Sequence, residues 1–215
     1  MIDSSDILRT ISIVSVPIVS AITIHEWSHA FVANLRGDRS AKMLGRLSFN
    51  PIKHIDPLGT IIIPISLIVL NTGMLFGWAK PVPVNANALK KPRWDMALVA
   101  IAGPASNIIM AVLWAISHNN ADPSSSCGGW LYQTSVSGVL INVFLAVLNM
   151  LPILPLDGGR ILSAILPRRY VYYYDKTEPF GFFILIGLLV TGILPTIIGP
   201  YINYTIELIN RLFLT

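Results

Sequence analysis

Residues 25–29 read His-Glu-Trp-Ser-His, so two histidines one helical turn apart stand on either side of a glutamate. On a helix both imidazoles lie on one face and can bind the same metal ion, while Glu26 lies beside that ion and can activate water. This arrangement is typical of zinc-dependent hydrolysis of peptide bonds. A chance match on a soluble helix is the alternative, and the surroundings of the motif argue against it.

The flanks of the motif, residues 7–24 and 30–35, are almost free of charge. The motif lies 11 residues before Arg36, which is roughly 16 Å at the rise of an α-helix. This segment is long enough to cross a bilayer, so the motif is expected well below the lipid headgroups. Ionisable groups at such depth are costly and are usually kept for a function. We therefore expect a reaction that consumes water inside a membrane.

The composition agrees with a membrane protein. Of 215 residues, 53% are hydrophobic and 12% are charged, whereas about a quarter of the residues of a soluble domain are charged. The net charge of +4 comes from basic loops between apolar runs. The sequence has no interleaved basic and aromatic pattern of the kind that predicts nucleic-acid binding. The lone Cys127 excludes an intrachain disulfide and a zinc site built from cysteines. The length fits a single integral-membrane domain, residues 1–215, with no removed signal peptide at its start.

Apolar runs of about 20 residues or more predict membrane segments. They are Ile7 to Leu35, Leu58 to Gly77, Met96 to Ser117, Leu131 to Leu154, and a longer run from Phe180 to Leu214 interrupted at Pro195 and Pro200. We therefore expect an all-α polytopic membrane protein with five to six membrane segments. Residues 36–56, 78–95 and 160–176 are rich in Lys and Arg, whereas 118–130 has neither. This asymmetry predicts that the three basic loops are cytoplasmic and that 118–130 is outside.

Two details of this topology are less regular. Alternating patterns at 42–49 and 81–87 predict short strands that form a small β-sheet or extended edge at the cytoplasmic side, with ordinary loop backbone as the alternative. Both flanks of 58–77 are basic, so this segment is predicted to enter and leave the membrane on the cytoplasmic side, bending near Pro64 or at 71–73.

A protease zinc needs a third protein ligand and an open fourth position. The extended pattern HExxHxxGxxH is excluded, because Val32 and Leu35 stand where it needs Gly and His. Asp157 is the acidic residue with the most unusual setting. It ends the run Asn149-Met-Leu-Pro-Ile-Leu-Pro-Leu-Asp157 and precedes two glycines, so prolines and glycines unwind the chain where an apolar segment ends. Asp157 is therefore a candidate ligand, and the alternative is a plain helix N-cap.

Two further polar residues allow two interpretations each. Asn107 lies midway along an apolar helix, where its amide needs a buried partner. It either has a direct role in substrate binding or metal-site support, or packs one helix on another, with Gly103 allowing close approach. His54 lies in a loop near Asp56. It is either a site residue or a structural histidine.

Three segments together resemble the site-2 protease family of intramembrane zinc metalloproteases. They are His25-Glu-Trp-Ser-His29, Ala102-Gly-Pro-Ala-Ser-Asn107 and Asn149-Met-Leu-Pro-Ile-Leu-Pro-Leu-Asp-Gly-Gly-Arg160, and the segment from Gly45 to Gly59 is similar to compact bacterial members. The resemblance implies that His25, His29 and Asp157 bind one Zn²⁺ per chain and that Glu26 is the general base. It also implies that Asn149 lies close to the zinc and orients substrate or stabilises the oxyanion. The chain has no room for the PDZ domain or the nucleotide-sensing domain of larger relatives.

The expected function is hydrolysis of peptide bonds within or near the transmembrane helices of membrane proteins, a step of regulated intramembrane proteolysis. The expected partners are a single-span membrane protein as substrate and the lipid bilayer, and the sequence does not indicate an oligomeric state. We expect the chain in the bacterial cytoplasmic membrane, with the active site toward the cytoplasmic side. One alternative is a membrane transporter of zinc or another divalent metal, for which His118-Asn-Asn-Ala-Asp122 resembles a second metal motif. The other is a catalytically silent membrane scaffold.

Overall fold

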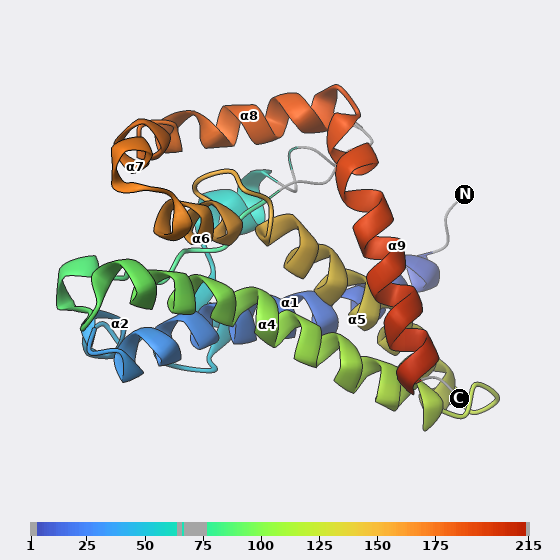
Figure 1. Ribbon diagram of the computed structural model, residues 1–215. Coiled ribbons are helices and arrows are strands. Elements are labelled where there is room, and N and C mark those ends of the chain that lie inside the picture. The colour runs from blue at the N-terminus through green and yellow to red at the C-terminus, as the bar shows by residue number, and fades with distance from the viewer. Residues whose placement is uncertain (1–3, 64–65, 67–76, 214–215) are drawn as a thin grey trace.

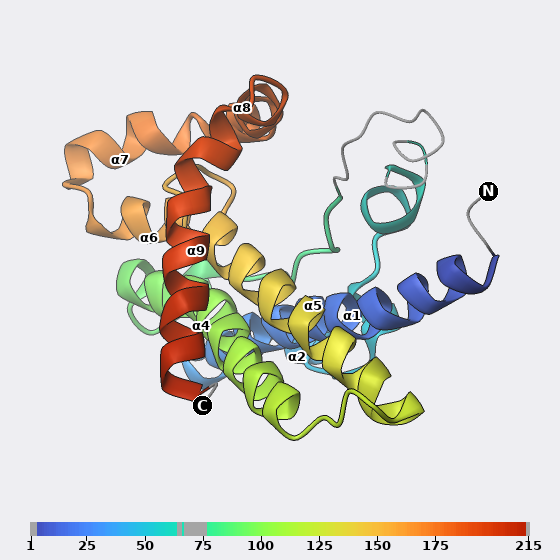
Figure 2. The ribbon, with the colours of Figure 1, turned by 90° about the vertical axis from the view of Figure 1, so that its right-hand side faces the viewer.

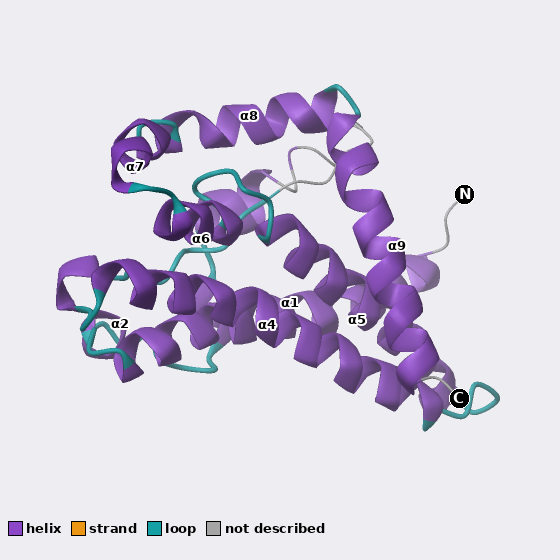
Figure 3. Cartoon of the chain, in the orientation of Figure 1, coloured by secondary structure: helices purple, strands orange, loops and turns teal. Residues whose placement is uncertain are grey.

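The structure is a computed structural model that describes residues 4–63, 66 and 77–213. In these residues every regular element is helical, as the prediction of an all-α protein requires (Figure 3). The α-helices are α1 (Ser4–Leu35), α2 (Ser40–Met43), α4 (Pro92–Asn119), α5 (Ser126–Asn149), α6 (Asp157–Ile165), α7 (Arg168–Asp175), α8 (Glu178–Val190) and α9 (Ile193–Phe213). Single turns of 3₁₀ or π-helix occur at η1 (Pro51–His54), η2 (Pro57–Ile62) and η3 (Ala86–Ala88).

Helices α1, α4 and α5 form the central bundle and lie side by side (Figures 1 and 2). Each is long and apolar enough to cross a membrane over Leu8–Leu35, Pro92–Asn119 and Cys127–Asn149, respectively. The shortest of these stretches has 23 residues, or about 35 Å at helical rise, against a hydrocarbon core of about 30 Å. Large apolar side chains such as Leu8, Ile109 and Leu140 are exposed on the outside of the bundle, where they can contact lipid.

Helices α8 and α9 pass the same test only as a pair, and they are bent by 84°. The bend falls at Thr191 and Gly192, where Gly192 adopts a φ of +71° that other residues rarely take. The break predicted at Pro195 and Pro200 is therefore misplaced. Pro195 lies in the first turn of α9, where a missing N–H is tolerated, and Pro200 lies inside the helix.

The described residues thus provide three membrane-spanning helices, or four if the bent pair counts as one. The predicted five to six segments are not supported. Of the predicted segment 58–77, only 58–63, 66 and 77 are described. The two ends of this segment meet, because Trp78 N–H donates to the Gly59 carbonyl at 3.1 Å and Lys80 N–H donates to the His54 carbonyl at 3.0 Å.

The predicted β-sheet is wrong for the residues that the structure describes, since none of them forms a strand (Figure 3). Ala41 is buried against Ala30 of α1, and the chain around it closes a helical turn, α2. Gly45 follows at φ +67° and turns the backbone, so 42–49 contains a short helix and a turn in place of a strand.

The second predicted strand, 81–87, is loop backbone from Pro81 to Asn85, whose own dihedral angles are extended, and then enters η3. It has no partner strand, because its backbone N–H groups bind carboxylates of other segments. Val82 N–H donates to Glu26 at 2.8 Å, and Asn85 N–H donates to Asp38 at 2.7 Å. The expectation of a sheet is therefore wrong for these residues, and the segment is the ordinary loop that was the alternative.

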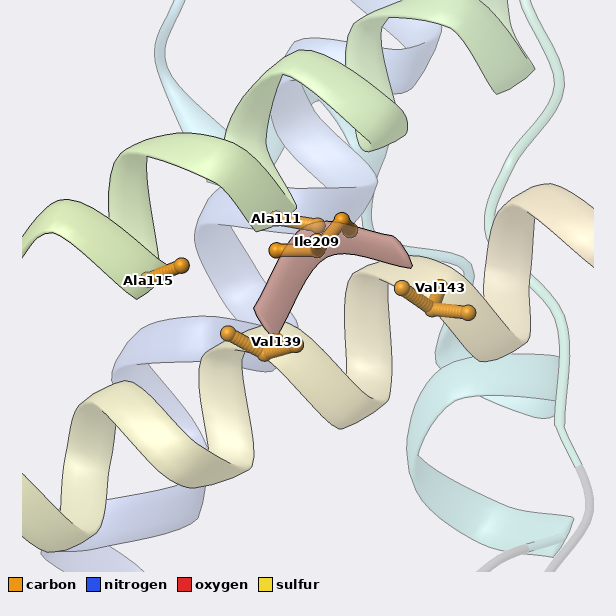
Figure 4. Packing of buried hydrophobic residues seen from close by; sticks show 5 residues of the cluster. All are labelled: Ala111, Ala115, Val139, Val143 and Ile209. Carbon is orange, nitrogen blue, oxygen red and sulfur yellow. The ribbon is translucent and has the colours of Figure 1, made fainter. Parts of the chain in front are cut away.

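The core of the bundle is built from small and β-branched residues. Ala111 and Ala115 of α4 pack against Val139 and Val143 of α5, and Ile209 of α9 closes the cluster (Figure 4). Alanine at these positions lets α4 and α5 approach closely, which is how membrane helices gain packing energy without a hydrophobic effect between them. Helix α9 crosses this pair (Figures 1 and 2). The cluster therefore fixes α4 relative to α5, and both carry residues of the site described next.

Candidate metal centre

Three of the predicted site residues meet in the bundle. His25 and His29 of α1 bring their Nε2 atoms to 3.0 Å from each other. Asp157, the first residue of α6, places Oδ2 3.3 Å from His25 Nε2 and Oδ1 3.4 Å from His29 Nε2. No side-chain cap bond is made at the start of α6, so the carboxylate of Asp157 faces the histidines and does not serve as a plain N-cap.

The other ring nitrogen of each histidine is held by α4. His29 Nδ1 lies 2.7 Å from the carbonyl oxygen of Val99, which can only accept, so Nδ1 carries the proton and donates it. His25 Nδ1 lies 2.6 Å from Asn107 Oδ1 and donates in the same way. In the neutral imidazole each Nε2 then has a lone pair, and this is the state in which histidine binds metals.

The donor set fits a zinc ion. The Nε2 atoms of two histidines converge with a carboxylate, and Asp157 Oδ2 is buried without a hydrogen-bond donor. In a tetrahedral site with metal–ligand distances of about 2.0 to 2.1 Å, ligand atoms stand about 3.3 Å apart, close to the separations found here. Among the described residues, His25, His29 and Asp157 are the group of His, Cys, Asp and Glu that could hold a metal. A cation at their centre would satisfy all three.

Gly103 of α4 makes this geometry possible. A Cβ atom at this position would stand 2.4 Å from His29 Nε2 and 2.6 Å from His25 Cε1. The sequence suggested that Gly103 allows one helix to approach another. The structure shows that what it approaches is the pair of imidazoles itself.

Asp157 is positioned by the chain on either side of it. The backbone leaves helical conformation between Asn149 and Asp157, as the prolines of this stretch predict. The two following glycines then pack directly on that loop. A Cβ at Gly158 would stand 2.2 Å from the Met150 carbonyl oxygen, and one at Gly159 would stand 2.5 Å from the Leu154 nitrogen. Residues 150–154 therefore form the support on which the first turn of α6 rests.

Glu26 lies between the two histidines in the sequence but is not part of the group of three. Its Oε2 accepts a hydrogen bond of 2.8 Å from Val82 N–H, in the loop that precedes η3. Val82 was not recognised from the sequence, because a backbone donor leaves no signature in residue types.

The remaining predicted residues occupy different places. Asn107 is fully buried, and its Oδ1 lies 2.6 Å from His25 Nδ1. Asn149 is the last residue of α5, and its side-chain amide donates to the Leu145 carbonyl at 2.9 Å. His54 is buried in η1, with Nε2 2.9 Å from the Ser48 carbonyl oxygen, and it is outside the metal group. The contact with Ser48 favours the interpretation of His54 as a structural histidine.

Comparisons with known proteins point to one family. A model of peptidase family M50 matches residues 124–192. The chain is 37% identical to "Putative zinc metalloprotease YwhC" of Bacillus subtilis, over 92% of this chain and 89% of the relative. It is 30% identical to "Putative zinc metalloprotease Rip2" of Mycolicibacterium smegmatis, over 87% and 73%, respectively. A shorter match, 34% identical over 42% of this chain and 26% of the relative, is to zinc metalloprotease MJ0392 of Methanocaldococcus jannaschii. No solved structure matches.

Proposed function

The chain belongs to peptidase family M50 and is a membrane-embedded zinc metalloprotease, and from that premise we propose that His25, His29 and Asp157 hold one catalytic Zn²⁺ with Glu26 as general base. The observation that carries this proposal is the convergence of two Nε2 atoms and one carboxylate at separations of 3.0 to 3.4 Å. The predicted family, activity and zinc cofactor are confirmed by the comparisons. The assignment of individual residues is our proposal.

When bound, zinc acts as a Lewis acid on water and on the scissile carbonyl. Glu26 accepts the proton of the attacking water and delivers it to the amine nitrogen as the C–N bond breaks. The hydrogen bond from Val82 N–H holds one carboxylate oxygen of Glu26, which leaves the other oxygen for this transfer.

Asn149 is proposed to donate its side-chain amide to the oxyanion or to orient the substrate. In this structure that amide donates to the Leu145 carbonyl. A role in the reaction therefore requires rotation of the Asn149 side chain away from its own helix.

The proposed substrate is a single-span membrane protein. The carbonyl groups of a transmembrane helix are committed to internal hydrogen bonds, so the helix must unwind before its backbone can be attacked. Residues 81–85 lie outside any helix and contact Glu26 through Val82 N–H. They offer backbone beside which an unwound substrate could lie as an added strand.

We further propose that the chain is a single domain, residues 1–215, in a bacterial cytoplasmic membrane, with its active site toward the cytoplasm. The hydrogen bonds that join Gly59 to Trp78 and His54 to Lys80 support the predicted topology. A segment that crossed the membrane once would separate its ends by about 30 Å, whereas these ends touch. Both basic flanks of 58–77 can then be cytoplasmic.

Cysteine labelling tests this topology. In a background without Cys127, cysteines at positions 53 and 80 should both react only with reagent on the cytoplasmic side. Labelling of position 80 from outside, with position 53 labelled from the cytoplasm, would show a true crossing.

Glu26→Gln tests the catalytic assignment. The purified variant should bind zinc with the parent's stoichiometry and fail to cleave a generic transmembrane peptide, because the amide cannot accept the proton. Glu207→Gln, a change of the same kind at an exposed residue of α9, is the matched control and should cleave normally. Normal turnover by Glu26→Gln would refute the role of Glu26.

The transporter hypothesis is not better supported. His118 lies in the last turn of α4 with its ring against Tyr132, and Asp122 accepts hydrogen bonds from Ser124. Neither belongs to the metal group found among the described residues. Cation transport without peptidase activity in the parent would favour this alternative.

A further inference from the structure

A chain of hydrogen bonds runs from His25 into the interface between α4 and α5. His25 Nδ1–H donates to Asn107 Oδ1 at 2.6 Å, and Asn107 Nδ2–H donates to Asn142 Oδ1 at 3.0 Å. Asn142 Nδ2–H donates in turn to the Gly138 carbonyl at 2.9 Å. Asn107 and Asn142 are both 0% exposed, so water does not compete for these bonds.

These hydrogen bonds can run in only one direction, from His25 toward Gly138. The last group, the Gly138 carbonyl, can only accept a hydrogen bond, so the NH₂ group of Asn142 must face it. The Oδ1 atom of Asn142 then faces Asn107 and accepts from its NH₂ group, which turns Asn107 Oδ1 toward His25. His25 must therefore donate from Nδ1, so in the neutral imidazole its Nε2 presents a lone pair toward His29 and Asp157.

Helix packing alone does not explain why residue 142 is an asparagine. Asn142 precedes Val143, a fully buried member of the apolar cluster between α4, α5 and α9 (Figure 4). An apolar side chain would fill the same space without the cost of burying an amide. A second acceptor for Asn107, the Ala21 carbonyl, is more distant at 3.3 Å, so Asn142 provides the shorter of the two bonds that orient the Asn107 amide.

We propose that Asn142 is a positioning residue for the metal centre, acting through Asn107 to hold His25 with Nε2 available to the metal. This inference rests on the proposed zinc site and extends it to a residue of α5 that touches neither metal ligand nor substrate. Residues that orient a metal-binding histidine change metal affinity about 10- to 100-fold when they are replaced. Asn142 acts one bond further away, so its effect should fall near the lower limit of that range.

The first test compares zinc affinity, by chelator competition, among variants of the full chain in lipid nanodiscs. Asn142→Leu removes the acceptor and should weaken zinc binding about tenfold. Asn142→Asp, which as a buried neutral acid can accept from Asn107 and donate to Gly138, should restore affinity to within about twofold of the parent. Thr134→Val is the control, because Thr134 is also a fully buried polar residue of α5 but its hydroxyl has no hydrogen-bond partner. It should bind zinc like the parent.

A double-mutant cycle tests whether Asn142 acts through Asn107. Asn107→Leu breaks the link to His25, so adding Asn142→Leu should cause no further loss of zinc affinity. If Asn142→Leu does not fold, as judged by its thermal unfolding, the smaller Asn142→Val replaces it in both experiments.

Three results would overturn the proposal: unchanged zinc affinity in Asn142→Leu, equal losses in Asn142→Leu and Asn142→Asp, or additive losses in the double variant. In each of these cases the parent still binds zinc and the proposed function stands. If the parent itself binds no zinc, the proposed zinc site fails and this inference fails with it.

Discussion

Gly103→Ala is the smallest substitution that should disable the metal centre. The added Cβ would stand 2.4 Å from His29 Nε2 and 2.6 Å from His25 Cε1, whereas ordinary van der Waals contact begins at 3.4 Å. The imidazoles and α4 must therefore separate by about 1 Å. A shift of this size moves the ligand atoms far enough that the three of them can no longer share one ion. Gly103→Ala should therefore weaken zinc binding.

The expected magnitude follows from the cost of overpacking a well-packed core, about 1 to 3 kcal/mol. If this cost falls on the metal-bound geometry, zinc affinity drops about 5- to 150-fold. Helix propensity acts in the opposite direction, because alanine favours a helix interior over glycine by about 1 kcal/mol. The apo protein should therefore unfold at an unchanged or slightly higher temperature unless the clash also weakens the packing of α1 on α4.

Chelator competition and thermal unfolding of the apo protein, measured on the same preparation, separate these effects. Gly187→Ala in α8 is the matched control, because a Cβ there meets nothing within 4 Å. It should bind zinc like the parent. Parental zinc affinity and activity in Gly103→Ala would refute the claim that α4 must touch the imidazoles at this point.

Two further predictions concern carboxylates with different partners. Asp157→Ala should lose zinc as completely as His25→Ala. Asp56→Ala should keep zinc, because the Asp56 carboxylate caps η2 by accepting from the N–H groups of Leu58 and Gly59. Equal zinc content in Asp157→Ala and parent would reject Asp157 as a ligand. For Asp38, burial raises the pKa, but hydrogen bonds from Ser40 and Asn85 lower it by more, so the pKa lies below its ordinary value. A lowered folded-state pKa stabilises the fold above the unfolded value of about 3.9 and loses that effect as the pH falls through the folded value. The thermal stability that the parent holds over Asp38→Asn at pH 7 should therefore shrink below about pH 4, and a difference independent of pH would contradict this account.

The predicted features that the structure contains depend on residues close together in the chain. A spacing of four places His25 and His29 on one helical face, whatever surrounds that helix. Long apolar runs predicted α1, α4 and α5, because a bilayer requires a minimum helix length. Prolines and glycines predicted the break between Asn149 and Asp157, since they act on their own backbone. The choice of Asp157 among the acidic residues also depended on the resemblance of the segment from Asn149 to Arg160 to a known family.

The errors and omissions involve partners that are distant in the chain. Alternation at 42–49 and 81–87 is compatible with strands, but a strand needs a partner, and the N–H groups of Val82 and Asn85 bind Glu26 and Asp38. The bend between α8 and α9 was assigned to prolines, although Pro195 fits the first turn of a helix and Gly192 supplies the turn.

By itself, then, the sequence determined the helical class, the membrane-spanning helices of the central bundle, and a pair of histidines beside a glutamate. The tertiary structure decided which groups complete that pair. Asp157 reaches it because α6 begins against α1, Gly103 allows α4 to approach it, and Asn142 orients Asn107 from a third helix. These contacts depend on the crossing of α1, α4 and α5, which arises from packing across the bundle and is not encoded in any single segment.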